Sequence, residues 1–134
     1  MAGYSGTPLV QKLGIKAGMR LYVEGAPKGY FQTLRGIPTV VQATRLMKPL
    51  DFIQCFVMAR KDLETRFGAL EDALAIDGML WISWPKQASK VETDITEDAV
   101  REIALAHGLV DVKVCAVDDV WSALKLVRRL EDRA

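Results

Sequence analysis

The hydrophobic positions of the chain fall into alternating strand-like and helix-like runs. Four short apolar runs predict strands, at residues 19–23, 39–44, 52–58 and 79–84. The last two contain almost no polar residue, and a strand that is apolar on both sides is typical of a parallel sheet covered by helices on both faces. Between them, leucine and phenylalanine recur at spacings of four, three and four over residues 63–74, which predicts a helix that ends at Gly78.

The end of the chain has a different pattern. Residues 109–117 and 121–129 are both β-rich, and the connection between them is too short for a crossover helix, so they must pair as an antiparallel hairpin. Thr96 is expected to begin the preceding helix and Gly108 to end it. Shorter helices are expected after Thr7 and at residues 30–35.

Together these elements predict an α/β fold. We expect a Rossmann-like three-layer sandwich, with a mostly parallel sheet of about six strands that ends in an antiparallel hairpin. The chain has 134 residues, a usual size for one domain, so we expect a single domain over residues 1–134.

Composition excludes several classes of protein. Half of the residues are hydrophobic and 26% are charged, the balance of an ordinary globular domain. No apolar run approaches the ~18 residues of a membrane span, and the N-terminus has no export signal, so we expect a cytoplasmic protein with no membrane partner. Cys55 and Cys115 are expected to be buried in strands, because neither has metal or redox spacing. His107, the single histidine, is expected to have a structural role at a helix end, so no metal site is predicted.

Charge is distributed unevenly although the net charge is only +1. Residues 1–61 carry nine Lys and Arg but only two acids, for a net charge of +7, whereas residues 62–134 carry a net charge of −6. One interpretation is that the charges simply solvate the surface. The other is that the N-terminal half attracts anionic partners.

The segment from Asp51 to Lys86 resembles the fourth and fifth strands of class I methyltransferases, a variant of the Rossmann fold whose parallel sheet also ends in an antiparallel hairpin. It contains a buried strand, an amphipathic helix, the stop at residues 76–78 and a second buried strand. The chain is also similar, over its whole length and above all at residues 79–86 and 108–129, to a small bacterial family known only as a domain of unknown function. That second resemblance implies the fold but no activity.

The methyltransferase resemblance implies a Gly-x-Gly-x-Gly loop after the first strand, where glycines let the backbone approach S-adenosyl methionine. Gly25 and Gly29 match the outer two glycines, but Pro27 occupies the central position. Proline fixes φ and lacks an N–H group, so the loop must follow a different path. The acid expected at the end of the strand aligns with Val23, and neighbouring Glu24 is the residue that could substitute for it.

Two further departures affect the same site. The acid that accepts hydrogen bonds from the cofactor ribose should follow the second strand, but no acid occurs between Glu24 and Asp51, and Arg45 lies near its position. One helix–strand pair is also missing between Thr44 and Asp51. From these departures we expect no cofactor, with S-adenosyl methionine disfavoured.

Parallel α/β sheets bind ligands beyond the carboxyl ends of their strands. The residues that follow the predicted strand ends form the candidate crevice: Glu24, Gly25, Pro27, Lys28, Gly29, Tyr30, Arg60, Lys61, Trp84 and Lys86. Four of them are cationic, so the crevice is expected to prefer an anionic small molecule or an acidic protein surface. Tyr30 and Trp84 are its candidate walls, and no catalytic residue is assigned.

Three functions remain open from the sequence. The first is a non-catalytic Rossmann-like binding module with a degenerate cofactor loop, which we expect to be a binding protein rather than an enzyme. The second is a minimal S-adenosyl methionine-dependent methyltransferase. The third is a homo-oligomer in which the acidic half of one copy faces the basic half of another.

Overall fold

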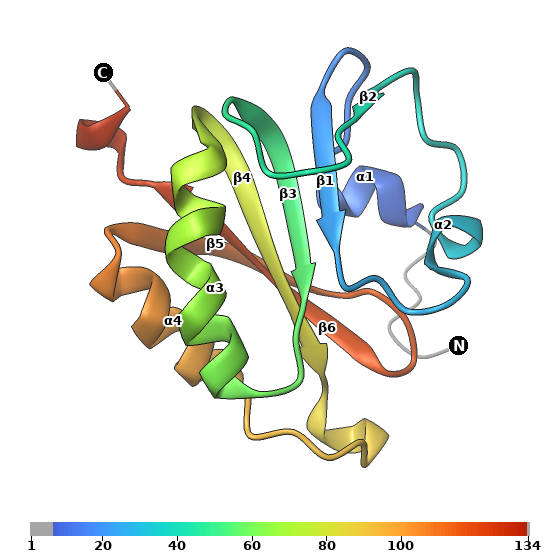
Figure 1. Ribbon diagram of the computed structural model, residues 1–134. Coiled ribbons are helices and arrows are strands. Elements are labelled where there is room, and N and C mark those ends of the chain that lie inside the picture. Colours follow the sequence, from blue (N-terminus) through green and yellow to red (C-terminus); the bar gives the residue numbers. More distant parts are fainter. Residues whose placement is uncertain (1–6, 134) are drawn as a thin grey trace.

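The computed structural model describes residues 7–133. The helices are α1 (Leu9–Leu13), α2 (Tyr30–Thr33), α3 (Arg60–Ala73) and α4 (Glu97–Ala106), with 3₁₀ turns at η1 (Gln87–Ser89) and η2 (Leu130–Asp132). The strands are β1 (Arg20–Glu24), β2 (Val41–Gln42), β3 (Leu50–Phe56), β4 (Leu74–Pro85), β5 (Leu109–Ala116) and β6 (Trp121–Arg128). Figure 1 shows their arrangement.

The strands form one sheet in the order β2-β1-β3-β4-β6-β5. The pairs β1–β2, β1–β3 and β3–β4 are parallel, whereas β6 pairs antiparallel with both β4 and β5. This topology confirms the Rossmann-like α/β fold with a closing hairpin. The segment 43–49 joins β2 to β3 without a helix or strand, which confirms that a helix–strand pair is missing there.

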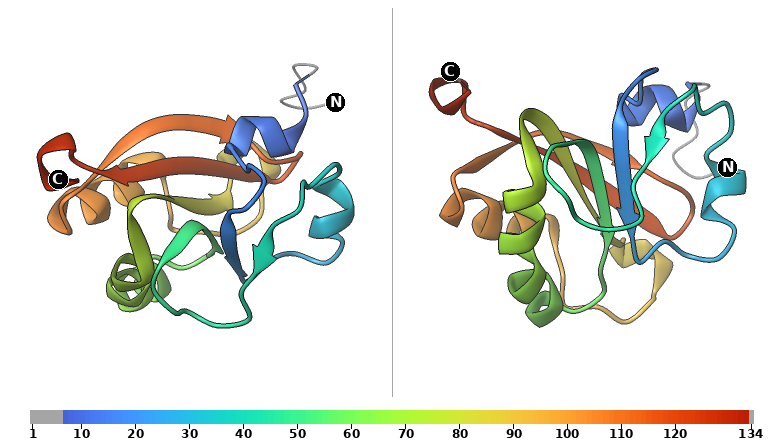
Figure 2. Two further views of the ribbon diagram at one scale, coloured as in Figure 1. Left: turned by 90° about the horizontal axis from the view of Figure 1, so that it is seen from above. Right: turned by 45° about the horizontal axis from the view of Figure 1, so that its top comes forward.

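Each face of the sheet packs against its own helices, which gives three layers (Figures 1 and 2). One core joins α3 and α4 to the face that carries Ile53, Ile82 and Leu124. The other core joins α1 and α2 to the opposite face, which carries Phe52 and Trp81. Residues alternate between the two cores along β3 and β4 because successive side chains of a strand point to opposite faces.

The turn around Gly78 differs from the prediction. Helix α3 ends at Ala73, and β4 begins at Leu74, so Gly78 lies inside the strand and does not end the helix. The register between β3 and β4 shifts at this point, and a Cβ at Gly78 would lie 2.9 Å from the Leu50 carbonyl oxygen. Glycine is therefore needed for close approach of two backbones.

Other boundaries differ more modestly. Pro8 occupies the N-cap position of α1 with no side-chain cap bond, so Thr7 does not cap that helix. The Thr96 hydroxyl does cap α4, accepting a hydrogen bond from the Ala99 amide at 3.1 Å. Cys55 is buried as expected, but Cys115 is only half-buried because β5 is an edge strand. Within residues 7–133, no helix is long and apolar enough to cross a membrane.

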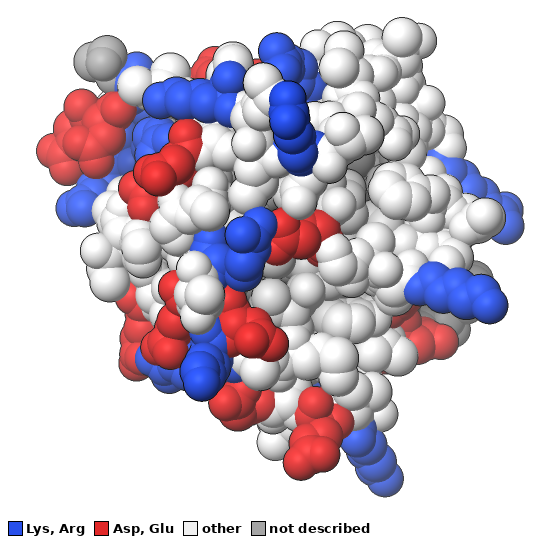
Figure 3. Space-filling view, viewed as in Figure 1, with Lys and Arg blue, Asp and Glu red and all other residues white. Residues whose placement is uncertain are grey.

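The face shown in Figure 3 does not divide into two patches of opposite charge. Acidic and basic side chains mix over α3 and α4, whereas the area over β1 is largely uncharged. Arg60, for example, contacts Glu64 at 3.3 Å and Glu102 at 3.4 Å. Two acids of the second half of the chain therefore pair with Arg60, a cation of the first half.

Candidate functional site

The loops that follow β1, β3 and β4 lie at the same edge of the sheet (Figure 1). This is the carboxyl edge of the parallel strands. Glu24 at the end of β1 lies beside Cys55, and Phe56 at the end of β3 lies beside Ser83. The fold therefore brings the glycine loop, residues 25–29, next to the edge where α/β proteins bind ligands.

The glycine loop closes through a tight turn. The Tyr30 amide donates a hydrogen bond to the Pro27 carbonyl oxygen at 3.0 Å. Gly29, the third residue of this turn, has φ 81° and ψ 5°, which is the geometry of a type II turn and requires a left-handed residue. Pro27 thus starts the turn through its carbonyl, and its missing N–H removes no bond from it.

Gly25 lies against the end of β3. Its φ is +71°, and a Cβ built on it would lie 2.7 Å from the Phe56 carbonyl oxygen. Any other residue would be strained by its backbone conformation and would also clash with a neighbouring backbone. The first glycine of the loop is therefore required by the structure.

Glu24 does not substitute for the missing acid in the crevice. Its carboxylate lies on the α3 face, where it accepts hydrogen bonds from Arg66 Nε at 2.8 Å and Nη2 at 2.5 Å and from the Tyr22 hydroxyl at 2.8 Å. The Arg66 hydrogen bonds lower the pKa of Glu24, although partial burial opposes the shift. Arg66 is not among the residues predicted from the sequence, because it is one charged residue beside Phe67 of the apolar stripe of α3 and gives no separate signal.

Tyr30 is not an exposed wall of the crevice. Its side chain is buried at 2% exposure, and its hydroxyl bonds to the side-chain carbonyl oxygen of Gln54. The Gln54 side-chain amide in turn donates to the Ser83 hydroxyl at 3.0 Å. Burial raises the pKa of Tyr30 well above its usual value, so this hydroxyl stays protonated.

The end of β2 carries neutral and basic groups. Gln42 and Ala43 line a small hollow of about 60 Å³ together with Phe31 and the β1 residues Leu21 and Val23. No carboxylate is among the residues that line it. Arg45, at the position of the expected ribose acid, donates to the Met47 sulfur at 3.1 Å.

A larger cavity of about 510 Å³ lies where β4 ends, beside the N-terminus of α4. Trp84 and Ile95 contribute apolar surface, Lys86 and Lys90 contribute ammonium groups, and Glu92 and Glu97 contribute carboxylates. The segment 86–95 that borders it is fastened to the β3–α3 turn, because the Asp94 carboxylate accepts a hydrogen bond from the Arg60 amide at 2.7 Å. We call this space the β4 cavity.

The structure brings together only part of the predicted crevice. Trp84, otherwise buried in the core, and Lys86 both line the β4 cavity. Lys28, Arg60 and Lys61 are not among its lining residues. Arg60 instead pairs with acids of α3 and α4, so its guanidinium points along the helices.

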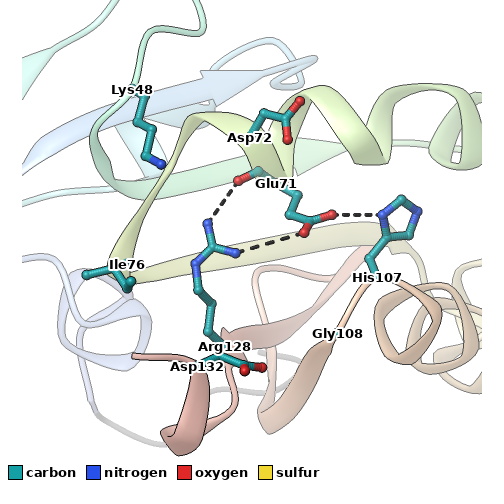
Figure 4. A pocket seen from close by; sticks show the side chains of 8 residues that line it. All are labelled: Lys48, Glu71, Asp72, Ile76, His107, Gly108, Arg128 and Asp132. Atoms are coloured by element: carbon teal, nitrogen blue, oxygen red, sulfur yellow. Dashed lines mark hydrogen bonds and ion pairs between the residues drawn. The ribbon is translucent and has the colours of Figure 1, made fainter. Parts of the chain in front are cut away.

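A depression of about 420 Å³ lies at the opposite edge of the sheet (Figure 4). There His107 Nδ1 lies 2.8 Å from a carboxylate oxygen of Glu71, and Arg128 Nη2 donates to the carbonyl oxygens of Glu71 at 3.1 Å and Leu74 at 2.9 Å. These contacts join the C-terminal ends of α3 and α4 to β6. The geometry gives His107 a structural role, far from the glycine loop. Across residues 7–133, no group of three or more His, Cys, Asp or Glu side chains could hold a metal ion.

Solved structures with the same fold are class I methyltransferases. Magnesium protoporphyrin IX methyltransferase from Synechocystis PCC 6803, solved with bound SAH, has a TM-score of 0.61 at 12% identity. The matched region covers 90% of this chain and 78% of the methyltransferase chain. A SAM-dependent methyltransferase from Aquifex aeolicus has a TM-score of 0.60 at 14% identity, covering 88% of this chain and 86% of its own. A putative type 11 methyltransferase from Sulfolobus solfataricus has a TM-score of 0.62 at 13% identity, and the match covers 90% of this chain and 89% of the methyltransferase chain.

No protein-family model and no curated protein matches the sequence, so the comparison rests on solved structures alone. They confirm a shortened class I methyltransferase fold for this chain. Our expectation of a non-catalytic module without a cofactor is wrong on this comparison, because the similar structures are methyltransferases and two of them contain bound SAM or SAH. The comparison favours the methyltransferase alternative.

Proposed function

We propose that this protein binds S-adenosyl methionine at the carboxyl edge of its sheet and transfers the methyl group to an anionic acceptor. The single observation that carries this proposal is the glycine loop after β1. It keeps two left-handed glycines, and it packs against the end of β3 so closely that a Cβ at Gly25 has no room. It does so in a sheet whose structural neighbours are methyltransferases.

The residues at this edge can hold the cofactor through exposed backbone and one side chain. Gly25 and Gly29 leave backbone uncovered for close approach of a ligand. At the end of β2, Gln42 offers a side-chain carbonyl oxygen that can accept hydrogen bonds from ribose hydroxyls in place of the missing acid. The hollow beside Gln42 is far smaller than the 300 Å³ or more of typical small-molecule sites, so the cofactor would lie along the open edge.

S-adenosyl methionine, when bound, supplies an electrophilic methyl group. The β4 cavity is the space for the acceptor, since it opens at the same edge and has both apolar and charged walls. Lys86 and Lys90 offer ammonium groups to an anionic acceptor there. Glu92 and Glu97 line the same cavity, so the attraction is local to the two lysines and does not come from the charge of the cavity as a whole. An acceptor that arrives deprotonated needs no general base, and we assign none.

The cofactor part of the proposal is tested by NMR titration of the labelled protein with SAH. We expect chemical-shift changes at the amides of Gly25, Gly29 and Gln42, and little change at His107 on the opposite edge. Adenosine monophosphate serves as the control ligand, because it shares the nucleoside but lacks the amino-acid part. Shift changes confined to the His107 edge, or none at millimolar SAH, would contradict the proposal.

The acceptor part is tested separately with a Lys86→Ala and Lys90→Ala double variant. A panel of carboxylates and phosphates is titrated against wild type and variant at low and high salt. We expect weaker binding of the anions to the variant and a smaller difference at high salt, because exposed charges are screened. Equal binding at both salt concentrations would remove the anionic acceptor but leave the cofactor proposal standing.

A further inference from the structure

The helix that follows the glycine loop is too short to hold the loop in place by itself. Helix α2 spans only Tyr30–Thr33. A single turn of helix is unstable in isolation, because too few hydrogen bonds form for the dihedral angles that must be fixed. The position of the loop must therefore depend on contacts between α2 and the sheet.

A buried chain of hydrogen bonds supplies such a contact. The Tyr30 hydroxyl bonds to Gln54 on β3, and Gln54 bonds to Ser83 on β4, so the first residue of α2 is tied to two central strands. Tyr30 is 2% exposed, and Gln54 and Ser83 are fully buried. Because all three side chains are buried, each of these polar groups depends on its protein partners for its hydrogen bonds.

Ring packing connects the same anchor to the first glycine. The Tyr30 ring meets the Phe56 ring edge to face, with 4.8 Å between ring centroids. Phe56 is also the residue whose carbonyl oxygen excludes a Cβ at Gly25. Gly25, which begins the loop, and Tyr30, which follows it, therefore both contact the same residue at the end of β3.

We propose that Tyr30 is a positioning residue, which holds the glycine loop in its ligand-binding shape through the hydrogen-bond chain to Gln54 and Ser83. Its effect on the cofactor rests on the proposed function, but its effect on the loop does not. Removal of the hydroxyl leaves the Gln54 carbonyl oxygen buried without that donor, a loss that the loop can relieve by moving to admit water.

The test is Tyr30→Phe, with Tyr22→Phe as the matched control. The control deletes the same atom, but its partner Glu24 keeps both hydrogen bonds from Arg66. Hydrogen exchange is measured at the amides of residues 30, 32, 33 and 34, which donate hydrogen bonds in the loop and α2. We expect Tyr30→Phe to lower their protection about tenfold, and the control to change it little.

Amides of β3 distinguish positioning from simple destabilisation. We expect their protection to stay unchanged in Tyr30→Phe while the Kd for SAH rises about tenfold. Unchanged protection of α2, or an equal loss in α2 and β3, would overturn the proposal. If Tyr30→Phe folds poorly, Ser83→Ala provides a milder break of the same chain, with the same order of effects expected. A wild type that binds no SAH would overturn the proposed function, whereas the exchange data would still decide the role of Tyr30.

Discussion

The two halves of the molecule are held together in different ways. From β3 onward, long helices cover the sheet: α3 spans 14 residues and α4 spans 10. Before β3, the helices have five and four residues, and β2 has only two. Yet the candidate site is built mainly on this sparser half, where the glycine loop and Gln42 lie.

The difference lies in what stabilises each half. In the second half, α3 buries residues such as Phe67 and Leu70 completely, and burial of apolar surface is enough to fix its position. In the first half, short segments also bury apolar side chains such as Leu13 and Leu34, but single hydrogen bonds fasten them as well: Trp81 Nε1 donates to the Leu13 carbonyl oxygen at 3.0 Å, and Tyr30 bonds to Gln54. The site half should therefore respond to the loss of one hydrogen bond as well as to the loss of volume.

The largest expected effect comes from the helix core. Phe67→Ala should lower the free energy of unfolding by about 3–5 kcal/mol, because it leaves a cavity under α3. Phe31→Ala on α2 is the matched control; its side chain is 45% exposed, so we expect a much smaller loss. Urea denaturation measures both. A similar loss in the free energy of unfolding for the two variants would contradict the difference proposed between the two halves.

The next effect concerns the glycine loop. Gly25→Ala combines a left-handed backbone with a 2.7 Å contact, whereas Gly18→Ala has a similar φ of +84° and nothing within 4 Å. Backbone strain costs each variant about 1–2 kcal/mol, and only Gly25→Ala adds the clash with β3. We expect Gly25→Ala to be clearly the less stable variant in urea. Equal stability would show that the loop does not rest on β3 as described.

The ion pair beneath the loop predicts a dependence on pH. Because Arg66 lowers the pKa of Glu24 in the folded protein, the pair stabilises the fold above the unfolded glutamate pKa of about 4.3. That stabilisation is lost as the pH falls through the lower folded pKa. In Arg66→Met, the free energy of unfolding should therefore fall less steeply between neutral and acid pH than in the wild type. Arg60→Met removes exposed ion pairs on the same helix and should hardly change this pH dependence. An identical pH dependence for wild type and Arg66→Met would refute this role.

The smallest effect distinguishes the two cysteines. Burial raises the pKa of Cys55 to about 12, whereas Cys115 is half-buried on the edge strand. Since the thiolate is the reactive form, we expect a maleimide to label Cys115 before Cys55 in the native protein. Mass spectrometry of partly labelled protein identifies the site. Earlier labelling of Cys55 would mean that the β1–β3 region opens readily.

Much of the fold could be predicted from the sequence because local patterns encode it. The continuous apolar runs of β3 and β4, the spacing along α3 and the short connection between β5 and β6 are all local signals. Gly78 shows the limit of such signals. A glycine after a helical pattern reads as a stop, but here it allows the β4 backbone to pass close to Leu50.

The candidate site was harder to predict because its contacts join distant residues. Gly25 and Gly29 are visible as a spaced pair, but Arg66 reaches Glu24 across 42 positions, and Tyr30 meets Gln54 across 24. Both partners come together only when α3 and α2 have packed on the sheet. From the sequence, a tyrosine beside a glycine loop could equally line the binding crevice or anchor the loop to the sheet. Only its burial in the structure decides between the two roles.

The most direct test of the account is calorimetric titration of SAH into wild type, Gly25→Ala and Gly18→Ala. We predict saturable one-to-one binding to wild type and to Gly18→Ala, and a loss of affinity in Gly25→Ala, because only that variant distorts the loop at the carboxyl edge. Absence of binding to the wild type, or equal affinity in all three proteins, would contradict a cofactor site on the glycine loop.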